Sequence, residues 1–414
     1  MLRYHRIFLL LILLAKISFP QHISLGIYSE YNVIPINNDS LALFYSFRIA
    51  NSLLVFEKTT NGFEAGFQIN IEITDSTSKF VKREFEQRKL ITQKFDETNS
   101  GEIFTEVLLK FNIPNEKLNL FPSFSDLKSN REIKLRNHVL FKTDFSKNKF
   151  LSPIIVKRMG SESNYSLVNF DSTIPFDNNS YTLIFPITDF SVDSLIVTLE
   201  SSIDTLRFVV TKFFDSQIVI ELNEQINVNL TQNENLKTRN FIFDNFSTKL
   251  SEDKLKIKVE TNERKTPIVF HKEVKWINKP KSLHNIDFAI KMLNYIEDEN
   301  VVASIKKAKN ESIALYNYWG KIDPSKETKF NELMYEFYTR VDYAVKNFTT
   351  VGVKNGAESD RGKVFIVYGE PSEIARINNH LGKVSEIWSY QKLGKSFTFI
   401  DKSGTGKFDL VEVK

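Results

Sequence analysis

Alternating apolar and polar residues dominate the first two thirds of the chain. The clearest case is residues 63–74, where Phe, Ala, Phe, Ile, Ile and Ile occupy every second position. Strict period-two alternation is typical of a strand with one buried and one solvated face. Residues 59–62 precede this strand and contain an Asn-Gly pair, which suits a tight hairpin turn. The pattern therefore predicts antiparallel sheet.

Two β-rich blocks follow from this pattern, and we expect each to form an antiparallel β-sandwich of the immunoglobulin or fibronectin type. The first block covers residues 22–142, with strands expected at 41–49, 52–58, 63–74 and 103–111. The second block covers residues 143–280, with strands expected at 181–187, 194–199, 206–211, 217–222 and 254–261. The polar tract 231–240 is either a long loop in one sandwich, which we prefer, or a break between two β units.

The charged stretch 79–89 (KFVKREFEQRK) resembles a basic ligand-binding patch at first sight. Phe80, Phe85 and Leu90 interleave the charges, and Glu84 and Glu86 partly neutralise them. Charges on an edge strand discourage one sheet from pairing with another. We therefore interpret this stretch as a solvated strand edge or face.

The hydrophobic period changes near residue 280. Apolar residues recur at helical spacing in 286–296 and 330–348, and 305–318 between them is also predicted to be helical. Strands are then expected at 364–368, 386–391, 396–401 and 408–413, with a glycine-bearing hairpin loop at 402–406. Residues 281–414 are therefore predicted to form an α+β domain with helices packed on an antiparallel sheet.

The N-terminus has the pattern of an export signal. A short basic region precedes the apolar run 7–14, and residues 18–21 break that run. The run is too short to span a bilayer, so we interpret residues 1–20 as a cleaved signal peptide without a transmembrane span in the mature chain. The formal charge of +4 includes Arg3, Arg6 and Lys16, and their removal leaves +1. This near-neutral charge gives no electrostatic reason to expect a nucleic-acid partner.

The residue inventory excludes several classes of site. The chain has no cysteine, which excludes disulfides, thiolate metal sites, thiol nucleophiles and an N-terminal lipid-modified cysteine. The six histidines are scattered singly without ligand spacing, so no metal site is expected. There is no G-x-S-x-G elbow. We expect no cofactor.

Candidate polar chemistry lies in the C-terminal domain. Asp323 before Pro324 fits a helix start, although Thr328 is an alternative cap. Glu332 and Arg340 flank Glu336 at intervals of four residues, so these side chains share one helix face and can pair.

Asp360 and Arg361 follow in a predicted loop bracketed by Gly356 and Gly362. We expect Arg361 to bind Glu332, Glu336 or Asp323 and so to pin this loop to the helix. A binding cleft or a catalytic site built from the same residues is the alternative. The candidate binding or structural cluster comprises Trp319, Asp323, Asn331, Glu332, Glu336, Arg340, Ser359, Asp360, Arg361 and Tyr368.

These residues stand in an order that resembles the GWxTD-domain proteins of bacterial envelopes, over residues 282–414. The core signature G-W-x-T-D-R-G is similar to residues 356–362 (GAESDRG). The other residues that carry the resemblance are Trp319, Asp323, Pro324, Thr328, Asn331, Glu332, Tyr338, Arg340, Val341, Tyr343, Ala344, Val364, Phe365, Ile366, Tyr368, Gly369 and Pro371.

Two positions depart from the family signature. Ala357 stands where the family has its tryptophan, and Ser359 replaces the threonine but keeps a hydroxyl. The loss of a large ring argues against a role in contacting a partner. It suits a packing role, in which Phe348 or Trp388 fills the space.

The resemblance implies an exported protein of the bacterial periplasm or cell surface. We expect a non-enzymatic binding or scaffold protein, with an unknown envelope protein or polymer as its partner. The alternative is a hydrolase-like envelope enzyme with its site around Asp323, Glu332, Arg340, Asp360 and Arg361.

Overall fold

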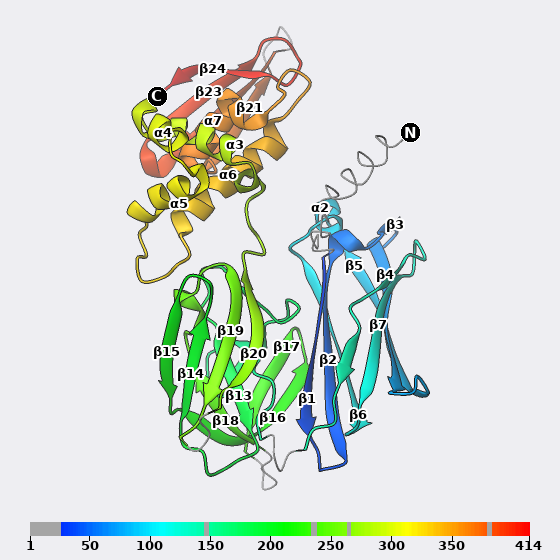
Figure 1. Ribbon diagram of the computed structural model, residues 1–414. Coiled ribbons are helices and arrows are strands. Elements are labelled where there is room, and N and C mark those ends of the chain that lie inside the picture. Colours follow the sequence, from blue (N-terminus) through cyan, green and yellow to red (C-terminus); the bar gives the residue numbers. More distant parts are fainter. Residues whose placement is uncertain (1–25, 145–148, 233–237, 263–265, 379–382) are drawn as a thin grey trace, which may run out of the picture. The chain divides into compact units, whose positions relative to one another are not determined.

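The computed structural model describes residues 26–144, 149–232, 238–262, 266–378 and 383–414 (Figure 1). The predicted signal peptide, residues 1–20, lies outside the described residues. The chain divides into two compact units. The first contains the described parts of Met1–Ile174, Tyr181–Asp244 and Leu255–Lys272, and the second contains Pro175–Ser180, Asn245–Lys254 and Glu273–Lys414.

The first unit begins with two antiparallel sheets that enclose a common apolar core. One sheet has the strand order β1-β2-β6, with bounds Ile27–Pro35, Ser40–Ala50 and Phe104–Pro114. The other has the order β3-β4-β7-β8, with β5 paired to β4 and β9 paired to β7. Its strands are Glu57–Thr59, Gly62–Asp75, Phe80–Thr92, Leu118–Asp126, Glu132–Lys134 and His138–Leu140 in chain order, and the short helix α2 (Phe95–Thr98) follows β5.

Strand β2 is buried on both faces. Tyr45 and Phe47 lie in the core that it shares with β4 and β7. Phe44, which points the other way, packs with Ile34 of β1 against residues of the second β-rich block, such as Ile184. This double burial explains why residues 41–50 are nearly all apolar, as in a strand covered on both sides.

The second β-rich block contains a closed barrel and a five-stranded sheet. The barrel has the order β10-β11-β17-β16-β18-β13, and these strands are Ile154–Arg158, Asn164–Leu167, Ile226–Thr231, Phe213–Leu222, Thr238–Phe243 and Thr182–Ile187. The sheet has the order β12-β20-β19-β14-β15, and its strands are Thr173–Pro175, Ile268–Lys275, Asp253–Glu260, Leu195–Glu200 and Thr205–Val210.

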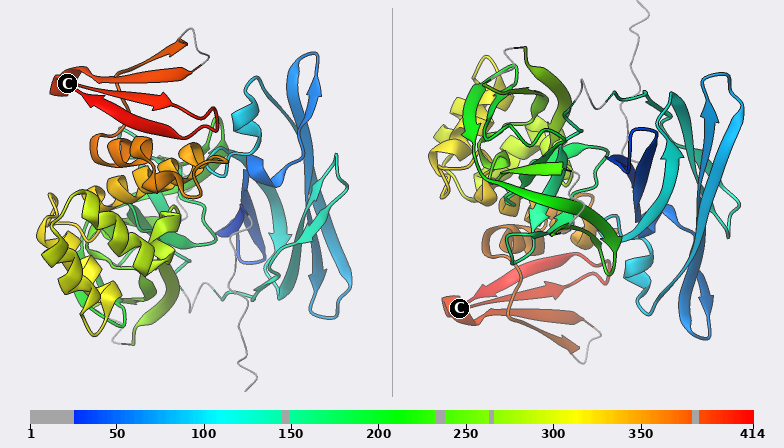
Figure 2. Two further views of the ribbon diagram at one scale, coloured as in Figure 1. Left: turned by 90° about the horizontal axis from the view of Figure 1, so that it is seen from above. Right: turned by 90° about the horizontal axis from the view of Figure 1, so that it is seen from below.

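The second unit places helices on one face of a four-stranded antiparallel sheet, β21-β22-β23-β24 (Figure 2). The helices are α3 (Ile286–Met292), α4 (Glu299–Lys306), α5 (Glu311–Lys321), α6 (Glu332–Phe348) and α7 (Asp360–Tyr368). The strands are Glu373–Asn378, Val384–Tyr390, Lys395–Asp401 and Phe408–Val413. Trp388 and Phe399 on the sheet and Val341 and Ile366 on the helices belong to one apolar core.

The expected fold class is confirmed: several antiparallel sheets are followed by a C-terminal region of helices and sheet. Three local predictions were wrong or incomplete. Residues 52–58 were expected to be a strand but contain a 3-10 turn (Asn51–Leu53) and the start of β3. The expected helix 305–318 is divided between α4 and α5 because Asn310 caps a new helix. In the polar tract 231–240, strand β18 begins at Thr238, and residues 233–237 lie outside the described part of the chain.

The largest correction concerns residues 364–368, which were predicted to be a strand and instead form the second half of helix α7. The sequence VFIVY has high strand propensity, since it consists of β-branched and aromatic residues. Tertiary packing overrides that propensity here, because Val364, Phe365 and Ile366 are all buried on a helix that lies against both α6 and the sheet.

Candidate functional site

The motif at residues 356–362 forms a tight turn followed by the first turn of helix α7. The Asn355 side chain accepts a hydrogen bond from the Ala357 amide (3.1 Å) and so opens the turn. The Ser359 hydroxyl donates to the Gly356 carbonyl (2.7 Å) and accepts from the Gly362 amide (2.9 Å). Ser359 is therefore the N-cap of α7, a role for which serine is among the preferred residues.

Both glycines of the motif are required by close backbone contacts. A Cβ atom on Gly356 would lie 2.1 Å from the Ala344 carbonyl oxygen of α6. A Cβ atom on Gly362 would lie 2.0 Å from the Gly356 carbonyl oxygen. The motif thus packs backbone against backbone, on α6 and on itself.

Asp360 joins the start of α7 to the edge of the sheet. Its Oδ2 atom accepts a hydrogen bond from the Leu410 amide of β24 (3.0 Å). Strand β24 is an edge strand, and an edge strand presents backbone donors that need partners. Asp360 satisfies one of these donors and also lies in the first turn of α7, where a negative charge is favoured.

Arg361 is buried between α7 and the sheet. Its Nη1 atom donates to Glu386 Oε2 of β22 (3.2 Å), and its Nη2 atom donates to the Gly406 carbonyl (3.3 Å). The guanidinium lies 4.0 Å from the ring centroid of Phe408 and 5.2 Å from that of Phe348. The side chain of Arg361 is 10% exposed and that of Glu386 is 2% exposed, so this is a buried charge pair with aromatic walls.

Glu386 is the acceptor on which the site converges. Besides Arg361, it accepts from Arg376 Nε (2.8 Å) and from the Trp388 indole (3.2 Å). Arg361 was expected to pair with Glu332, Glu336 or Asp323, and that expectation was wrong. The actual partner is Glu386. Glu386, Trp388 and Tyr390 occupy every second position of β22 and therefore share the face that packs against the helices.

Asp401 shapes the loop that supplies the Gly406 carbonyl to Arg361. Its Oδ1 atom accepts from the Ser403 and Gly404 amides, and its Oδ2 atom accepts from the Gly406 amide (2.8 Å). Burial pushes the pKa of Asp401 up, but the donated hydrogen bonds outweigh burial and hold that pKa below its ordinary value of 3.8.

Asp401→Asn is expected to lower the free energy of unfolding of the C-terminal unit by about 1–3 kcal/mol at pH 7, since it removes charge-assisted bonds. A carboxyl whose pKa is lower in the folded than in the unfolded state stabilises the fold above its unfolded pKa. Its contribution is lost as the pH falls below about 4. The difference between wild type and variant should therefore shrink between pH 5 and pH 3 in urea titrations followed by tryptophan fluorescence. A difference that stays constant over that range would contradict this role.

The remaining candidate residues lie away from the motif. Trp319 is buried on α5 and packs 5.3 Å from the ring of Phe337 on α6. Asn331 caps α6 by accepting from the Met334 amide (2.7 Å) and donates to the Trp319 carbonyl (2.8 Å). These residues fix the α5–α6 joint. The N-cap of α6 is Asn331, so the prediction that Asp323 or Thr328 begins this helix was wrong.

Arg340 lies at the opposite end of α7 from the motif. It pairs with Glu336 (2.9 Å), as predicted from the four-residue spacing, and faces the Ile366 and Val367 carbonyls at 3.5 and 3.4 Å. Since Asp360 begins α7 six residues before Ile366, the helical rise separates these two ends by about 9 Å.

Three further candidates also lie apart from the motif. Asp323 accepts from the Ser325 amide in the loop after α5. Glu332 has a buried Oε2 atom with no hydrogen-bond partner among the described residues. The Tyr368 ring packs 5.0 Å from that of Phe397.

Ala357, at the position of the family tryptophan, is fully buried. Its carbonyl accepts a hydrogen bond from the Tyr295 hydroxyl (3.1 Å). Phe348 and Trp388 belong to the same core, with their ring centroids 5.6 Å apart. The position is thus part of the core, which suits packing and leaves no side chain there to touch a partner.

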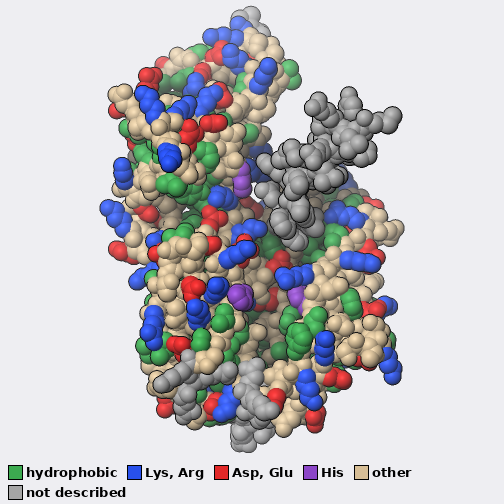
Figure 3. Space-filling view, viewed as in Figure 1, with side chains coloured by type: hydrophobic (Ala, Val, Ile, Leu, Met, Phe, Trp, Pro, Cys, Tyr) green, Lys and Arg blue, Asp and Glu red, His purple; other side chains and the backbone are tan. Residues whose placement is uncertain are grey.

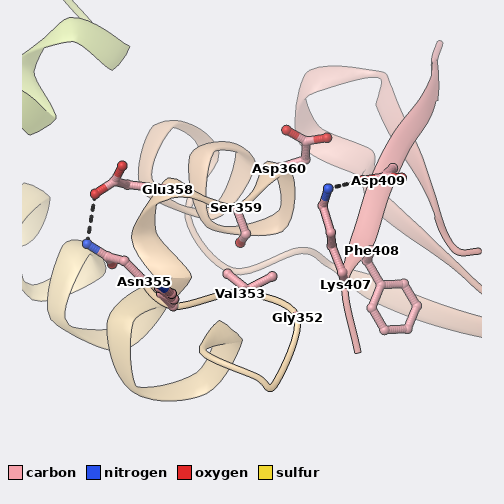
Figure 4. Close-up of a pocket in the computed structure, with 10 residues that line it drawn as sticks. Gly352, Val353, Asn355, Glu358, Ser359, Asp360, Lys407, Phe408 and Asp409 are labelled. Carbon is pink, nitrogen blue, oxygen red and sulfur yellow. Dashed lines mark hydrogen bonds and ion pairs between the residues drawn. The ribbon is translucent and has the colours of Figure 1, made fainter. Parts of the chain in front are cut away.

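A hollow of about 470 Å³ opens beside the motif (Figure 4). Figure 4 shows it between the loop that carries Val353 and Asn355 and the start of β24, where Lys407 pairs with Asp409 (3.6 Å). Lys354 is an exposed member of the lining. The lining is Gly352, Val353, Lys354, Asn355, Glu358, Ser359, Asp360, Lys407, Phe408 and Asp409.

The titratable groups around the site do not favour acid–base chemistry at neutral pH. Burial, together with the nearby Glu358 charge, raises the pKa of Tyr295 to about 12. Burial also raises the pKa of Tyr338 and of Tyr390. These hydroxyls stay protonated and act as hydrogen-bond donors. Within the described ranges, no three His, Asp or Glu side chains gather as a metal site.

Sequence reasoning missed Glu386, Asp401 and the lysines of the hollow. A signal for Glu386 was present, since an acid in register with Trp388 and Tyr390 on a predicted strand must face the core. Asp401 is three residues before Gly404 in the predicted hairpin loop, a spacing typical of side-chain-capped turns.

The site defines a class of protein: an α+β domain in which a glycine-flanked Ser-Asp-Arg turn joins helices to an antiparallel sheet. The GWxTD domain model matches residues 257–411, so the C-terminal region of this chain is a GWxTD domain, as the resemblance predicted. The match begins at residue 257, whereas the resemblance was placed from residue 282. It therefore includes the second half of β19 and all of β20.

Comparison with curated proteins finds no match. A solved structure, "Biofilm associated protein - BSP domain", is similar over 61% of this chain and 52% of its own, with 8% identity and a TM-score of 0.18. The chain thus spans about half the length of that structure. No helix among the described residues is long and apolar enough to cross a membrane.

Proposed function

We propose that this chain is an exported bacterial envelope protein that acts by binding and not by catalysis, with the GWxTD domain as a binding or scaffold module. The observation that carries the proposal is the use of Asp360 and Arg361. Both side chains are committed to joining α7 to the sheet, through Leu410 and Glu386. Arg361 is nearly buried in its pair with Glu386, and the Asp360 Oδ2 atom is occupied by the Leu410 amide, which supports a structural role for both residues.

The arrangement of the other candidates supports the same conclusion. A hydrolase-like enzyme would need its acids and arginines to converge on one space, within hydrogen-bond reach of a substrate. Here Arg340 contacts the C-terminal end of α7, whereas Asp360 and Arg361 lie at its N-terminal end. The five residues of the enzyme hypothesis are therefore spread over the domain.

The hollow beside the motif is the best candidate for the contact site. It joins the motif turn to the edge strand β24, and its lining mixes Lys354 and Lys407 with Glu358 and Asp409. On the face drawn in Figure 3, basic and acidic side chains are interspersed. Such a surface suits a polar envelope partner and gives no continuous basic field for a nucleic acid.

The test compares charge reversals in the hollow with matched reversals elsewhere. Lys354→Glu with Lys407→Glu is expected to abolish the capture of envelope partners by in-cell crosslinking, without lowering the melting temperature. Lys309→Glu with Lys326→Glu makes the same charge change at exposed positions outside the lining and should leave capture unchanged. Equal capture by all three proteins would reject the hollow as the contact site.

The enzyme alternative is separated by Asp360→Asn. If Asp360 is structural, this variant melts several degrees lower, as expected for loss of about 1–2 kcal/mol. If Asp360 is catalytic, the variant keeps the wild-type melting temperature and loses a turnover of envelope substrates, which would overturn the proposal.

A further inference from the structure

The outer face of the first unit's β5-β4-β7 layer carries three exposed phenylalanine rings. Phe80 is 59% exposed, Phe85 is 62% exposed and Phe121 is 37% exposed. Single exposed apolar residues are ordinary on a protein surface. Three rings on one face of this layer expose more apolar surface to water than such single residues do.

The strand register places these rings on the same face. Phe85 of β5 lies opposite Asn70 of β4, and Phe121 of β7 lies opposite Glu72 of β4. Asn70 and Glu72 flank the fully buried Ile71 and therefore point away from the core. In Figure 1, β5, β4 and β7 are drawn as neighbouring strands.

Phe80 shares this face because the pairing shifts by one residue between Ile73 and Thr74, so that Phe80 lies opposite Thr74, two residues beyond Glu72. From strand geometry, Phe85 and Phe121 are separated by about 10 Å across the sheet and about 7 Å along it. Among the described residues, the three rings do not pack on one another, so they form three separate points of contact.

Flat polar side chains fill the face between the rings. Arg83 of β5 pairs with Glu72 of β4, and Gln87 of β5 donates to the Gln68 side-chain oxygen of β4 (2.7 Å). Phe85 lies on β5 between Arg83 and Gln87. The face therefore alternates apolar rings with amide and guanidinium groups, and the charge of Arg83 is balanced by that of Glu72.

The inner side of β5 shows the opposite character. Lys82, Glu84, Glu86 and Arg88 alternate there in register with the buried residues of β4. Inward-pointing charges protect an edge strand from pairing with another sheet. The inner face of β5 is thus charged, whereas the outer face carries the exposed rings. The strand therefore does not have a general excess of apolar residues.

We propose that this outer face, defined by Phe80, Phe85, Phe121 and the Arg83–Glu72 and Gln87–Gln68 pairs, binds a neutral, linear polysaccharide. Sugar rings have apolar C–H faces that stack on phenyl rings, and their hydroxyls bond to amides, carboxylates and guanidinium groups at the ring edges. The balanced charge of the face complements an uncharged polymer and gives no attraction to a strongly charged one. The proposal concerns a different unit from the hollow and does not rest on the proposed function.

The experiment uses the full chain in native affinity gels that contain hydroxyethyl cellulose, a neutral β-linked glucan, or alginate, an anionic polymer. We expect hydroxyethyl cellulose to retard the wild type more than alginate does. Phe85→Ala with Phe121→Ala should weaken that binding by about tenfold or more, because each stacked ring contributes appreciably. Phe85 is mostly exposed and Phe121 is partly exposed, so any fall in the melting temperature should be small.

Two controls make the result specific. Phe95→Ala removes an equally exposed ring, 63%, on α2 away from this face, and it should bind hydroxyethyl cellulose as the wild type does. Lys354→Glu with Lys407→Glu tests the hollow and should also leave this binding intact. The proposal is overturned if hydroxyethyl cellulose does not retard the wild type, if alginate retards it more strongly, or if Phe95→Ala weakens binding as much as the double variant. It is likewise overturned if the face captures an envelope protein and no glucan.

Discussion

Replacing Arg361 by alanine is expected to lower the free energy of unfolding of the C-terminal unit by about 3–5 kcal/mol. The substitution leaves the nearly inaccessible Glu386 carboxylate without its buried partner and removes the cation held between Phe348 and Phe408. Removing one partner of a buried charge pair is among the most destabilising changes that a single substitution makes, and the partner that remains, Arg376, is exposed. Arg361→Lys keeps the charge but loses the planar fork, and an intermediate loss is expected.

Arg376→Ala provides the matched control, since Arg376 donates to the same carboxylate from a side chain that is 72% exposed. Exposed ion pairs contribute about 1 kcal/mol or less, so this variant should stay close to wild type. All three tryptophans, Trp276, Trp319 and Trp388, lie in the C-terminal unit, and urea unfolding followed by their fluorescence therefore reports on that unit alone. Equal losses for the two arginines would show that burial does not set the strength of this pair.

Gly362→Ala is expected to cost about 3 kcal/mol or more, or to prevent the C-terminal unit from folding. The added Cβ would lie 2.0 Å from the Gly356 carbonyl oxygen, which is backbone and cannot rotate aside. Gly356→Ala should behave in the same way, because its Cβ would lie 2.1 Å from the Ala344 carbonyl oxygen. Neither glycine is needed for a positive φ angle, so the cost is steric and not conformational.

Gly320→Ala is the control for this pair. Gly320 lies in helix α5, and a Cβ there meets nothing within 4 Å. Alanine is a better helix former than glycine, so this variant should gain about 0.5–1 kcal/mol. The loss of stability expected for Gly362→Ala and the gain expected for Gly320→Ala can be measured in one series of thermal melts. A Gly362→Ala protein as stable as the wild type would refute the close packing of the motif.

Much of this fold could be predicted from the sequence because the alternation of residues is strong where a sheet has one wet face. Residues 63–74 were expected as a strand and form β4, and residues 408–413 were expected as a strand and form β24. Prediction failed at 364–368, where β-branched and aromatic residues lie in a helix. Local propensity cannot show that such a helix is buried on several sides, since that depends on α6 and the sheet.

The sequence indicated which residues of the motif lie together better than it indicated which residues they bind. Ser359, Asp360 and Arg361 were predicted to lie together in a loop between two glycines; they do lie together, but as the N-cap and first two residues of helix α7. The partners of that turn come from β22 and β24, which lie 25 and about 50 residues further along the chain. A sequence gives the spacing of residues along a helix, as for Glu336 and Arg340, but not which strand will cross the helix end.

The double burial of β2 bears on how the chain can be divided for experiments. A fragment that stopped at residue 142 would retain Phe44 and Ile34 but would lack the barrel side chains that shield them from water. The same cut would release the Glu106 carboxylate from the Ile226 amide, to which it is hydrogen-bonded at 2.7 Å. Recombinant pieces intended for crystallisation or binding assays should therefore keep both β-rich blocks together.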